Sequence, residues 1–556
     1  ACMAAGMERR AWIIHLVCGL LVLLVTAPGL GWRHLWVDEV DTAERARSIL
    51  HAGYPQVVDA FDHVSLNSGG LELEEGLTHR YIPWLMYYAA AGGLLLGEPL
   101  GMTPDTAVRA PSVAAHAVTS TLVSWGLYTF AAVPLSVAAG ASLVLGVQAV
   151  RMVYARQARY QALLDMFLLM GLVGVAALRR GHQQGKYAVA AAILLMPHAH
   201  TLGGSVLSAA LGVLLLVQAY GASNRREALL LAVKWAVLPG LVSLVLLVIL
   251  TRPWLQGAWG ALQEPGGSSL SFSAILYPYT FGVMVTAGWT LATRRRDAVA
   301  ALVTLLFVGL VVTLLDGYSK SNPRYYLSVA LLAALWPLTV GAEDIPSSLR
   351  RYGLAGMLCI LLLPDVLRSI SVSGVPWEFQ GIRLAWHDAE LASLDEKQPL
   401  HNAVNIIREH GAATDPVLFD AVPQYGNWYL PGHPIGLLPD VADRTAVNAA
   451  NPLWERPLVF PVWHVWYPLW GSGTWTCTNR CDFKAELVDA EKPDGPYWLS
   501  SRRLGKRQLM CPIGAVATSR LINAPYLILS TGELGKDGPR AELLVVARRC
   551  EEAPPP

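Results

Sequence analysis

The strongest constraint on the fold of this chain is a succession of long apolar segments. An α-helix needs about 20 mostly apolar residues to cross the hydrocarbon core of a bilayer. Segments of this kind recur through the first two thirds of the chain, and they cover residues 12–30, 81–97, 109–130, 135–153, 163–178, 187–220, 228–250, 276–293, 298–315, 325–341 and 352–370. The pattern predicts an α-helical polytopic membrane protein.

The composition agrees with a membrane protein. Hydrophobic residues make up 54% of the 556 residues and charged residues 15%, against about 25% charged residues in soluble domains. The mean hydropathy is +0.40. Lys and Arg number 42 and Asp and Glu 41, so the net charge is +1 and no strong field attracts nucleic acid. These values disfavour a cytosolic globular protein, a disordered chain and a nucleic-acid-binding protein.

The basic clusters between the apolar segments predict the topology. Cytoplasmic loops carry an excess of Lys and Arg, and the clusters are Arg179-Arg180 with Lys186, Arg225-Arg226, Arg294-Arg295-Arg296 and Arg350-Arg351. If all of them are cytoplasmic, the spans between them come in even numbers. Residues 187–220 then count as two spans hinged at Pro197 to His200, and residues 81–97 form a helix lying at the outer interface. The total is about eleven transmembrane helices. The alternative interpretation of the first one is a cleaved signal peptide.

This topology divides the chain into two parts. Residues 1–370 form the transmembrane domain, which includes an outer loop at residues 31–108, and residues 371–556 form an extracytoplasmic domain. We expect a multi-pass protein of the plasma (inner) membrane. The C-terminal part is predicted to be α/β, with a helix over residues 391–410 and strands at residues 417–419, 458–460, 526–529 and 543–546.

Four of the seven cysteines, Cys477, Cys481, Cys511 and Cys550, lie in the C-terminal part. An even set of cysteines favours disulfides in an oxidising compartment. Free thiols are the alternative, and Cys477 with Cys481 also has the close spacing that begins some metal sites. The sequence does not choose among the three possible pairings of the four residues.

Two adjacent carboxylates open the predicted outer loop. Asp38 and Glu39 follow the first span closely and precede a predicted helix from Thr42 to Ala52. A carboxylate held at this position can take a proton from an acceptor hydroxyl. The alternative is a solvated helix N-terminus, where acidic residues are favoured in any case.

The second outer loop carries Arg156, Arg159 and Tyr160, followed by Asp165 at the start of an apolar segment. The two arginines are three residues apart and are expected on one helix face, where two guanidinium groups suit a phosphate. Snorkelling to lipid headgroups is the alternative. Asp165 would enter the bilayer, where an acidic residue is costly and usually functional.

Two further loops add candidate binding residues. His198 and His200 lie at the predicted hinge, where they could bind a metal or the substrate; capping of a helix or bonding to water is the alternative. Lys320, Arg324 and Tyr325 lie in a loop that the topology places outside. Cations there break the positive-inside bias, so phosphate binding is expected, with chance charge in a short loop as the alternative.

The sequence contains no Walker loop, dinucleotide fingerprint, HExxH or GxSxG motif, so nucleotide chemistry is unsupported. The remaining features are acids and cations at the outer edge of a membrane scaffold. Together they point to chemistry on a lipid phosphate.

Several short motifs occur in an order that is found in one known family. They are Trp36-Val37-Asp38-Glu39 with Gly53-Tyr54-Pro55, Arg109-Ala110-Pro111-Ser112, Ala158-Arg159-Tyr160 with Asp165, and the segment from Lys320 to Tyr325. Over about residues 12–370 the chain resembles the polyprenyl-phosphate-sugar glycosyltransferases of the GT-C fold, a class that includes protein O-mannosyltransferases and the lipid A aminoarabinose transferase. Tyr81-Ile82-Pro83 departs from a Lys-Pro-Pro or His-Pro-Pro of the relatives, and His79 and Arg80 are expected to substitute.

The resemblance implies an inverting transfer of a sugar from a polyprenyl-phosphate donor to an extracytoplasmic glycan, lipid or protein. It implies that Asp38 is the base, that Glu39 and Asp165 position the acceptor or a divalent metal such as Mg or Mn, and that Arg159, Lys320 and Arg324 stabilise the departing phosphate. The expected partners are this donor, the acceptor and membrane lipids. The alternatives are a transporter or flippase of a lipid-linked saccharide, and a non-catalytic polymer-binding or assembly protein.

Overall fold

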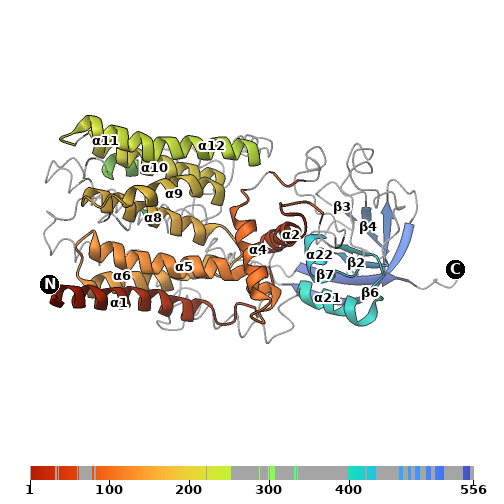
Figure 1. The fold of residues 1–556 in the computed structure, drawn as a ribbon. Helices are drawn as coiled ribbons and strands as arrows, with labels where there is room; N and C mark the ends of the chain where they lie inside the picture. The colour runs from red at the N-terminus through yellow and green to blue at the C-terminus, as the bar shows by residue number, and fades with distance from the viewer. Residues whose placement is uncertain are drawn as a thin grey trace.

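A computed structural model describes the chain as a helical bundle followed by a sheet domain (Figure 1). The observations below concern the residues that this structure describes, namely 2–31, 34–35, 37–58, 61, 78–80, 83–220, 222–251, 287, 299, 301–306, 328, 331–332, 335, 338, 399–419, 423–433, 462–466, 474–476, 483–488, 496–501, 507–518 and 542–550.

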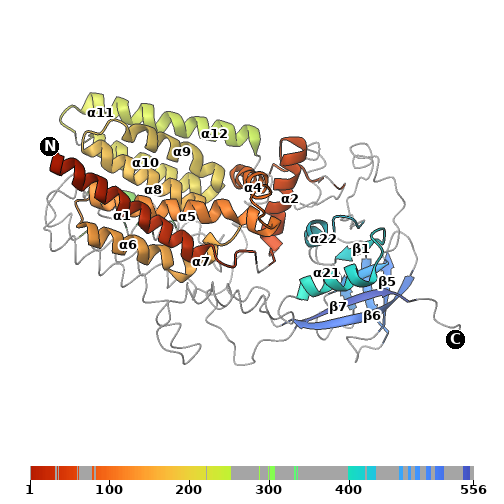
Figure 2. The ribbon, with the colours of Figure 1, turned by 60° about the horizontal axis from the view of Figure 1, so that its bottom comes forward.

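The bundle consists of long helices that lie side by side in both views (Figures 1 and 2). Its helices are α1 (Cys2–Thr26), α5 (Pro104–Thr129), α6 (Leu135–Val147), α7 (Ala149–Ala155), α8 (Gln161–Arg179), α9 (Gly185–Ala199), α10 (Thr201–Tyr220), α11 (Arg225–Ala232) and α12 (Leu238–Leu250). A π-helical turn, η1 (Val233–Val237), joins α11 to α12. The helices pack through apolar side chains, among them Leu168, Leu169 and Leu172 of α8, which are fully buried.

The predicted spans up to residue 250 fall on helices. Within the described residues, three helices are long and apolar enough to cross a membrane, and they cover Gln161–Arg179, Gly203–Tyr220 and Arg225–Leu250. Shorter apolar helices cover Arg10–Thr26, Leu85–Gly97 and Leu135–Val147. The predicted span 135–153 is divided, because Gln148 leaves the helical conformation between α6 and α7. Most of the chain beyond residue 251 up to 398 lies outside the described residues, so the count of eleven stays a prediction.

The break predicted within residues 187–220 is present. Helix α9 ends at Ala199, two residues after Pro197, and α10 begins at Thr201. His200 between them is extended, with φ −150° and ψ 116°. The chain folds back closely here, because a Cβ added at Gly204 would lie 1.9 Å from the carbonyl oxygen of Met196. Only a glycine fits such an approach.

Two helices of the predicted outer loop lie at the end of the bundle that faces the sheet domain (Figure 1). Helix α2 (Val37–Ala52) ends at Gly53, whose φ of +85° favours glycine. Helix α4 (Leu85–Gly97) packs against α5, and a Cβ at Gly93 would lie 2.2 Å from the carbonyl oxygen of Ala107. The prediction that residues 81–97 lie at the membrane interface is not tested, but the side chain of Tyr87 is buried inside the protein.

The described residues of the C-terminal part form one mixed sheet and two helices, which agrees with the predicted α/β class. The strands are β1 (Val417–Phe419), β2 (Trp463–Trp466), β3 (Thr474–Thr476), β4 (Phe483–Leu487), β5 (Tyr497–Ser501), β6 (Arg507–Thr518) and β7 (Glu542–Arg549), in the order β1-β2-β7-β6-β5-β4-β3. Strands β1 and β2 are parallel, and the other neighbours are antiparallel. Helices α21 (Pro399–His410) and α22 (Pro423–Tyr429) complete this part.

The predictions for this part are confirmed where residues are described. Strands β1 and β7 cover the predicted 417–419 and 543–546, and α21 covers most of the predicted helix 391–410. Residues 391–398, 458–460 and 526–529 lie outside the described residues.

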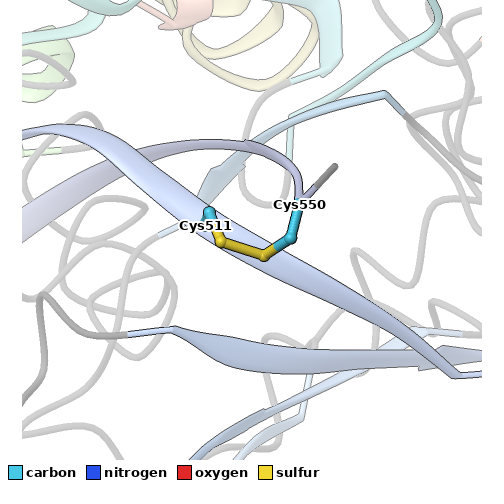
Figure 3. The surroundings of a disulfide bond; sticks show 2 residues. All are labelled: Cys511 and Cys550. Atoms are coloured by element: carbon cyan, nitrogen blue, oxygen red, sulfur yellow. A yellow bond between two sulfur atoms is a disulfide. The ribbon is translucent and has the colours of Figure 1, made fainter. Parts of the chain in front are cut away.

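The structure shows one disulfide among the four cysteines of the C-terminal part. Cys511 and Cys550 form a disulfide whose Cα atoms are 5.2 Å apart (Figure 3). Strands β6 and β7 are adjacent, and the amide of Cys550 donates to the carbonyl of Leu509. Sheet pairing therefore brings together two cysteines that are 39 residues apart in the sequence. Cys477 and Cys481 lie outside the described residues.

Candidate functional site

Several of the candidate residues that the structure describes lie at the end of the bundle that faces the sheet domain. We call this region the α2 pole; it consists of residues 34–35, α2, residues 78–80, α4, the start of α5, the α7–α8 turn and the α9–α10 hinge. Asp38 lies in the first turn of α2, and its side chain is outside the described residues. The next residue, Glu39, is held in place by several contacts.

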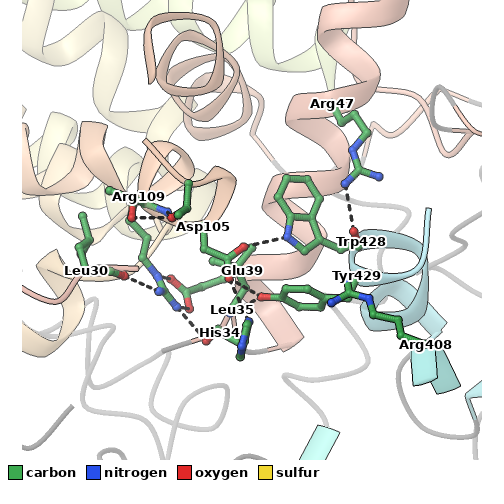
Figure 4. Close-up of polar contacts among 12 residues, drawn as sticks. Leu30, His34, Leu35, Glu39, Arg47, Asp105, Arg109, Arg408, Trp428 and Tyr429 are labelled. Carbon is green, nitrogen blue, oxygen red and sulfur yellow. Dashed lines mark hydrogen bonds and ion pairs between the residues drawn. The ribbon is translucent and has the colours of Figure 1, made fainter. Parts of the chain in front are cut away.

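Glu39 is held by Arg109 of α5 (Figure 4). The guanidinium donates from Nε to Oε1 at 2.8 Å and from Nη2 to Oε2 at 2.7 Å. The same Oε1 accepts from the amide of Ala158, at 2.8 Å. Both carboxylate oxygens are therefore engaged in a buried, bidentate ion pair. These contacts position the first turn of α2, and the expected role of Glu39 in positioning the acceptor stays a prediction.

Arg156 contacts backbone carbonyls near the end of α1. Its guanidinium donates to the carbonyls of Thr26 and Pro28, each at 2.7 Å, and to that of Gly29 at 3.2 Å. It therefore binds carbonyls at the C-terminal end of α1, a position where cations are favoured. The prediction that Arg156 and Arg159 share one helix face is wrong, because residues 156–160 form the turn between α7 and α8.

Asp165 also has a structural partner set. One carboxylate oxygen accepts from Arg151 of α7, and the other accepts from the hydroxyl of Ser328 at 2.5 Å. The ion pair with Arg151 is buried. An acidic residue among apolar helices needs such a partner. The expected role of Asp165 in positioning the acceptor stays a prediction.

Three of the predicted substrate-binding residues, Arg159, Tyr160 and His200, lie close together. The rings of Tyr160 and His200 stack with centroids 4.2 Å apart, and the guanidinium of Arg159 lies 5.8 Å from the Tyr160 ring. His200 Nδ1 accepts from the amide of Gly203 and so caps the start of α10, which was the alternative for this residue. His198 lies half-buried in the last turn of α9.

His79 belongs to a buried network that the sequence analysis did not include as a whole. Its Nε2 lies 3.2 Å from the hydroxyl of Tyr87, which is 3.3 Å from Oδ2 of Asp41, and Asp41 pairs with Arg45 one turn along α2. Burial, with a contribution from the charge of Arg45, lowers the pKa of His79 from 6.5 to about 3. The imidazole is therefore neutral in the fold.

The charge of Arg159 acts on Tyr87, a member of this network. Burial, followed by the charge of Asp41, raises the pKa of Tyr87 well above its usual value, while the charges of Arg45 and Arg159 act in the opposite direction. Arg80 next to His79 is half-buried. Lys320, Arg324 and Tyr325 lie outside the described residues.

Some residues of the α2 pole were missed by sequence reasoning. Asp41 and Arg45 are four residues apart on a helix, a spacing that could have identified their ion pair. No local sequence pattern indicates the contact between Tyr87 and His79. The same holds for the contact between Asp105 and Tyr429, which are 324 residues apart.

The described residues do not fit the expected divalent metal. No group of three or more His, Cys, Asp or Glu side chains comes together among them as a metal site. The two acids expected as ligands, Glu39 and Asp165, are each neutralised by an arginine.

Comparison with known proteins addresses the fold. No protein-family profile matches the sequence, and no curated protein matches it. Among solved structures, the chain is similar to ArnT, a lipid A aminoarabinose transferase, from Cupriavidus metallidurans bound to undecaprenyl phosphate, with 15% identity and a TM-score of 0.50 over 82% of this chain and 93% of that one. The chain has the GT-C fold. This agrees with the resemblance found in the motifs.

A second GT-C structure is similar at a lower level. It is the archaeal oligosaccharyltransferase AglB from Archaeoglobus fulgidus in complex with an inhibitory peptide and a dolichol-phosphate. The identity is 11% and the TM-score 0.43, over 89% of this chain and 74% of that one.

Proposed function

We propose that this chain is a membrane glycosyltransferase. It transfers a sugar from a polyprenyl-phosphate donor to an extracytoplasmic glycan, lipid or protein, with inversion at the sugar carbon. It acts in the plasma (inner) membrane, with residues 371–556 on the extracytoplasmic side.

The observation that carries this proposal is a GT-C fold in which the segment with Asp38 is fixed beside Arg159. Glu39, the residue after Asp38, accepts a hydrogen bond from the amide of Ala158 in the α7–α8 turn. Ala158 directly precedes Arg159. An acid and a cation are thus brought to one end of the helical bundle. The similar ArnT structure, which carries undecaprenyl phosphate, supports a lipid-linked donor.

The proposed chemistry is a single displacement. Asp38 takes the proton of the acceptor hydroxyl while the hydroxyl oxygen forms a bond to C1 of the sugar. The bond between C1 and the phosphate oxygen breaks on the opposite side, so the configuration is inverted. The polyprenyl phosphate leaves with its negative charge, which Arg159, Lys320 and Arg324 stabilise.

A flippase for a lipid-linked saccharide is the second candidate. Such proteins place charged residues near the bilayer midplane. Among the described residues the ion pairs of Glu39 and Asp41 lie at the α2 pole instead, and that of Asp165 lies close to the α7–α8 turn, near the start of α8. This placement favours the transferase.

The test is the substitution Asp38→Asn, which keeps the size of the side chain but removes the base. Cells carrying this variant at normal expression should lose transfer by about 10²–10⁴-fold. The lipid-linked donor should accumulate in the outer leaflet, where impermeant periodate oxidises it. Donor accumulating in the inner leaflet would favour a flippase, and unchanged transfer would remove Asp38 from the mechanism.

A further inference from the structure

The sheet domain contacts the segment that leads into α2. The amide of Leu35 donates to the hydroxyl oxygen of Tyr429, the last residue of α22, at 2.7 Å (Figure 4). The same hydroxyl donates to Oδ2 of Asp105 in the first turn of α5, at 2.7 Å. One tyrosine hydroxyl therefore joins three parts of the protein: the sheet domain, the bundle and the chain three residues before Asp38.

Asp105 receives several donors at once. Trp428 Nε1 donates to its Oδ1 at 2.9 Å, and His34 Nδ1 lies 3.3 Å from its Oδ2. Asp105 is 8% exposed and Tyr429 7% exposed, so the contact excludes water. Hydrogen bonds to an ionised carboxylate in such surroundings are stronger than those between neutral groups.

Protonation states favour this arrangement. Burial raises the pKa of Asp105, but the hydrogen bond from His34, the charge of Arg109 and the hydrogen bonds from Tyr429 and Trp428 together lower it below its usual value. Burial, with the charge of Tyr425 next, raises the pKa of Tyr429 well above its usual value. The carboxylate is thus charged and the phenol keeps the proton that it donates.

Two arginines bind the C-terminal end of α22, one from α2 and one from α21 of the same sheet domain. Arg47 of α2 donates to the carbonyls of Asn427 and Trp428, each at 3.3 Å, and its guanidinium lies 4.1 Å from the Trp428 ring centroid. Arg408 of α21 donates to the carbonyl of Tyr429 at 2.5 Å. These contacts place donors on three carbonyls at the C-terminal end of the short helix, where cations are favoured.

The segment around Asp38 is therefore fixed from two sides. From the bundle, Arg109 binds Glu39 and the carbonyl of His34, the latter at 3.0 Å. From the sheet domain, Tyr429 binds the amide of Leu35. We propose that Tyr429 is a positioning residue of the transfer reaction, through which the sheet domain sets the place of Asp38. This rests on the proposed function of Asp38.

The proposal gives the sheet domain a part in catalysis without contact to substrate. A general base has to lie within hydrogen-bond reach of the acceptor hydroxyl, and a displacement of about 1 Å can cost 10²-fold in rate. Tyr429→Phe removes one oxygen atom and leaves the ring, which packs edge-on against His34 with centroids 5.0 Å apart.

The experiment compares Tyr429→Phe with Tyr497→Phe in the full-length protein. Tyr497 is a matched control, because it is fully buried in the same domain and its hydroxyl lies 2.6 Å from His464 Nδ1, within the sheet. The first measurement is hydrogen exchange at the Leu35 amide. Loss of one hydrogen bond should speed this exchange about tenfold in Tyr429→Phe and leave it unchanged in Tyr497→Phe.

The second measurement separates turnover from donor binding. Turnover is the rate at which pulse-labelled lipid-linked sugar leaves the outer leaflet of cells, and binding is measured with a short-chain polyprenyl phosphate in detergent. Tyr429→Phe should lower turnover about tenfold and change the phosphate affinity less than twofold. Unchanged exchange at Leu35 overturns the contact, and faster exchange with unchanged turnover overturns the positioning role. Equal turnover in wild type and Asp38→Asn would instead overturn the proposed function, whatever the exchange at Leu35.

Discussion

At the scale of single residues, the buried acids of this protein are matched to specific partners. Glu39 pairs with Arg109, Asp41 with Arg45 and Asp165 with Arg151. A buried charge without a partner costs several kcal/mol, so these pairs are a condition of folding. Residue type and a place in a loop are therefore weak guides to catalysis here, since three of the buried acids among the described residues are each paired with an arginine.

His79 gives a prediction of pH-dependent stability. The folded protein keeps this imidazole neutral, with a pKa of about 3 in place of 6.5, whereas the unfolded chain takes up a proton below about pH 6.5. The unfolded state thus binds more protons between these values, and the free energy of unfolding falls as the pH falls. From pH 7 to pH 5 the loss should be about 2 kcal/mol.

The measurement is thermal unfolding in detergent at the two pH values. His79→Gln should reduce the difference between them, because glutamine does not titrate. His51→Gln, at an exposed position near the end of α2, should leave the difference as in wild type. If His79→Gln has the same pH dependence as wild type, other groups are responsible.

At the scale of elements, the α7–α8 turn separates two arginines that the sequence presents as a pair. Arg156 turns back to the carbonyls that end α1, while Arg159 is half-buried beside Tyr160. The turn also supplies the amide of Ala158 to Glu39 and the carbonyl of Arg159 to Ser112. The contacts of this turn join α1, α2, α5 and α8. Of its two arginines, Arg159 therefore remains the candidate for phosphate binding.

The two arginines should therefore respond differently to substitution by alanine. Arg156→Ala should lower the free energy of unfolding by about 1.5–3 kcal/mol, the range for hydrogen bonds to charged groups, and leave the affinity for a short-chain polyprenyl phosphate unchanged. Arg159→Ala should weaken that affinity by about tenfold or more with little effect on stability. Titration and thermal unfolding of both variants decide the matter, and an equal loss of affinity in both would contradict the assignment.

At the scale of the whole molecule, the fold brings a sheet domain against one end of a helical bundle. Figures 1 and 2 show α22 of this domain next to α2. The proposed transfer needs this end outside the cytoplasm, because acceptor and sheet domain are expected there. The disulfide between Cys511 and Cys550 is consistent with an oxidising compartment.

Labelling of introduced cysteines tests this topology. Glu409→Cys, at an exposed position of α21, should react with an impermeant maleimide in intact cells. Gln183→Cys, at an exposed position in the turn between α8 and α9, should react only after permeabilisation, because the Arg179-Arg180 cluster is predicted to be cytoplasmic. Labelling of position 409 only after permeabilisation would invert the topology.

The sequence by itself determined the fold class, the hinge at Pro197 to His200 and the presence of an α/β C-terminal part. It also predicted the helix from Thr42 to Ala52, which in the structure begins earlier, at Val37, and includes Asp38 in its first turn. These features depend on local patterns, because helix periodicity, apolar length and helix-ending residues act over a few neighbours. The order of short motifs also sufficed to find the resemblance to GT-C enzymes.

Only the tertiary structure decided what the polar residues of the α2 pole contact. Arg156, Glu39 and Asp165 are of the types found in active sites, but their partners Thr26, Arg109 and Arg151 are specified by packing. Tyr429 lies 394 residues from Leu35 in the sequence. Contacts over such distances depend on how whole elements dock, and no local propensity encodes which charge a buried acid will meet.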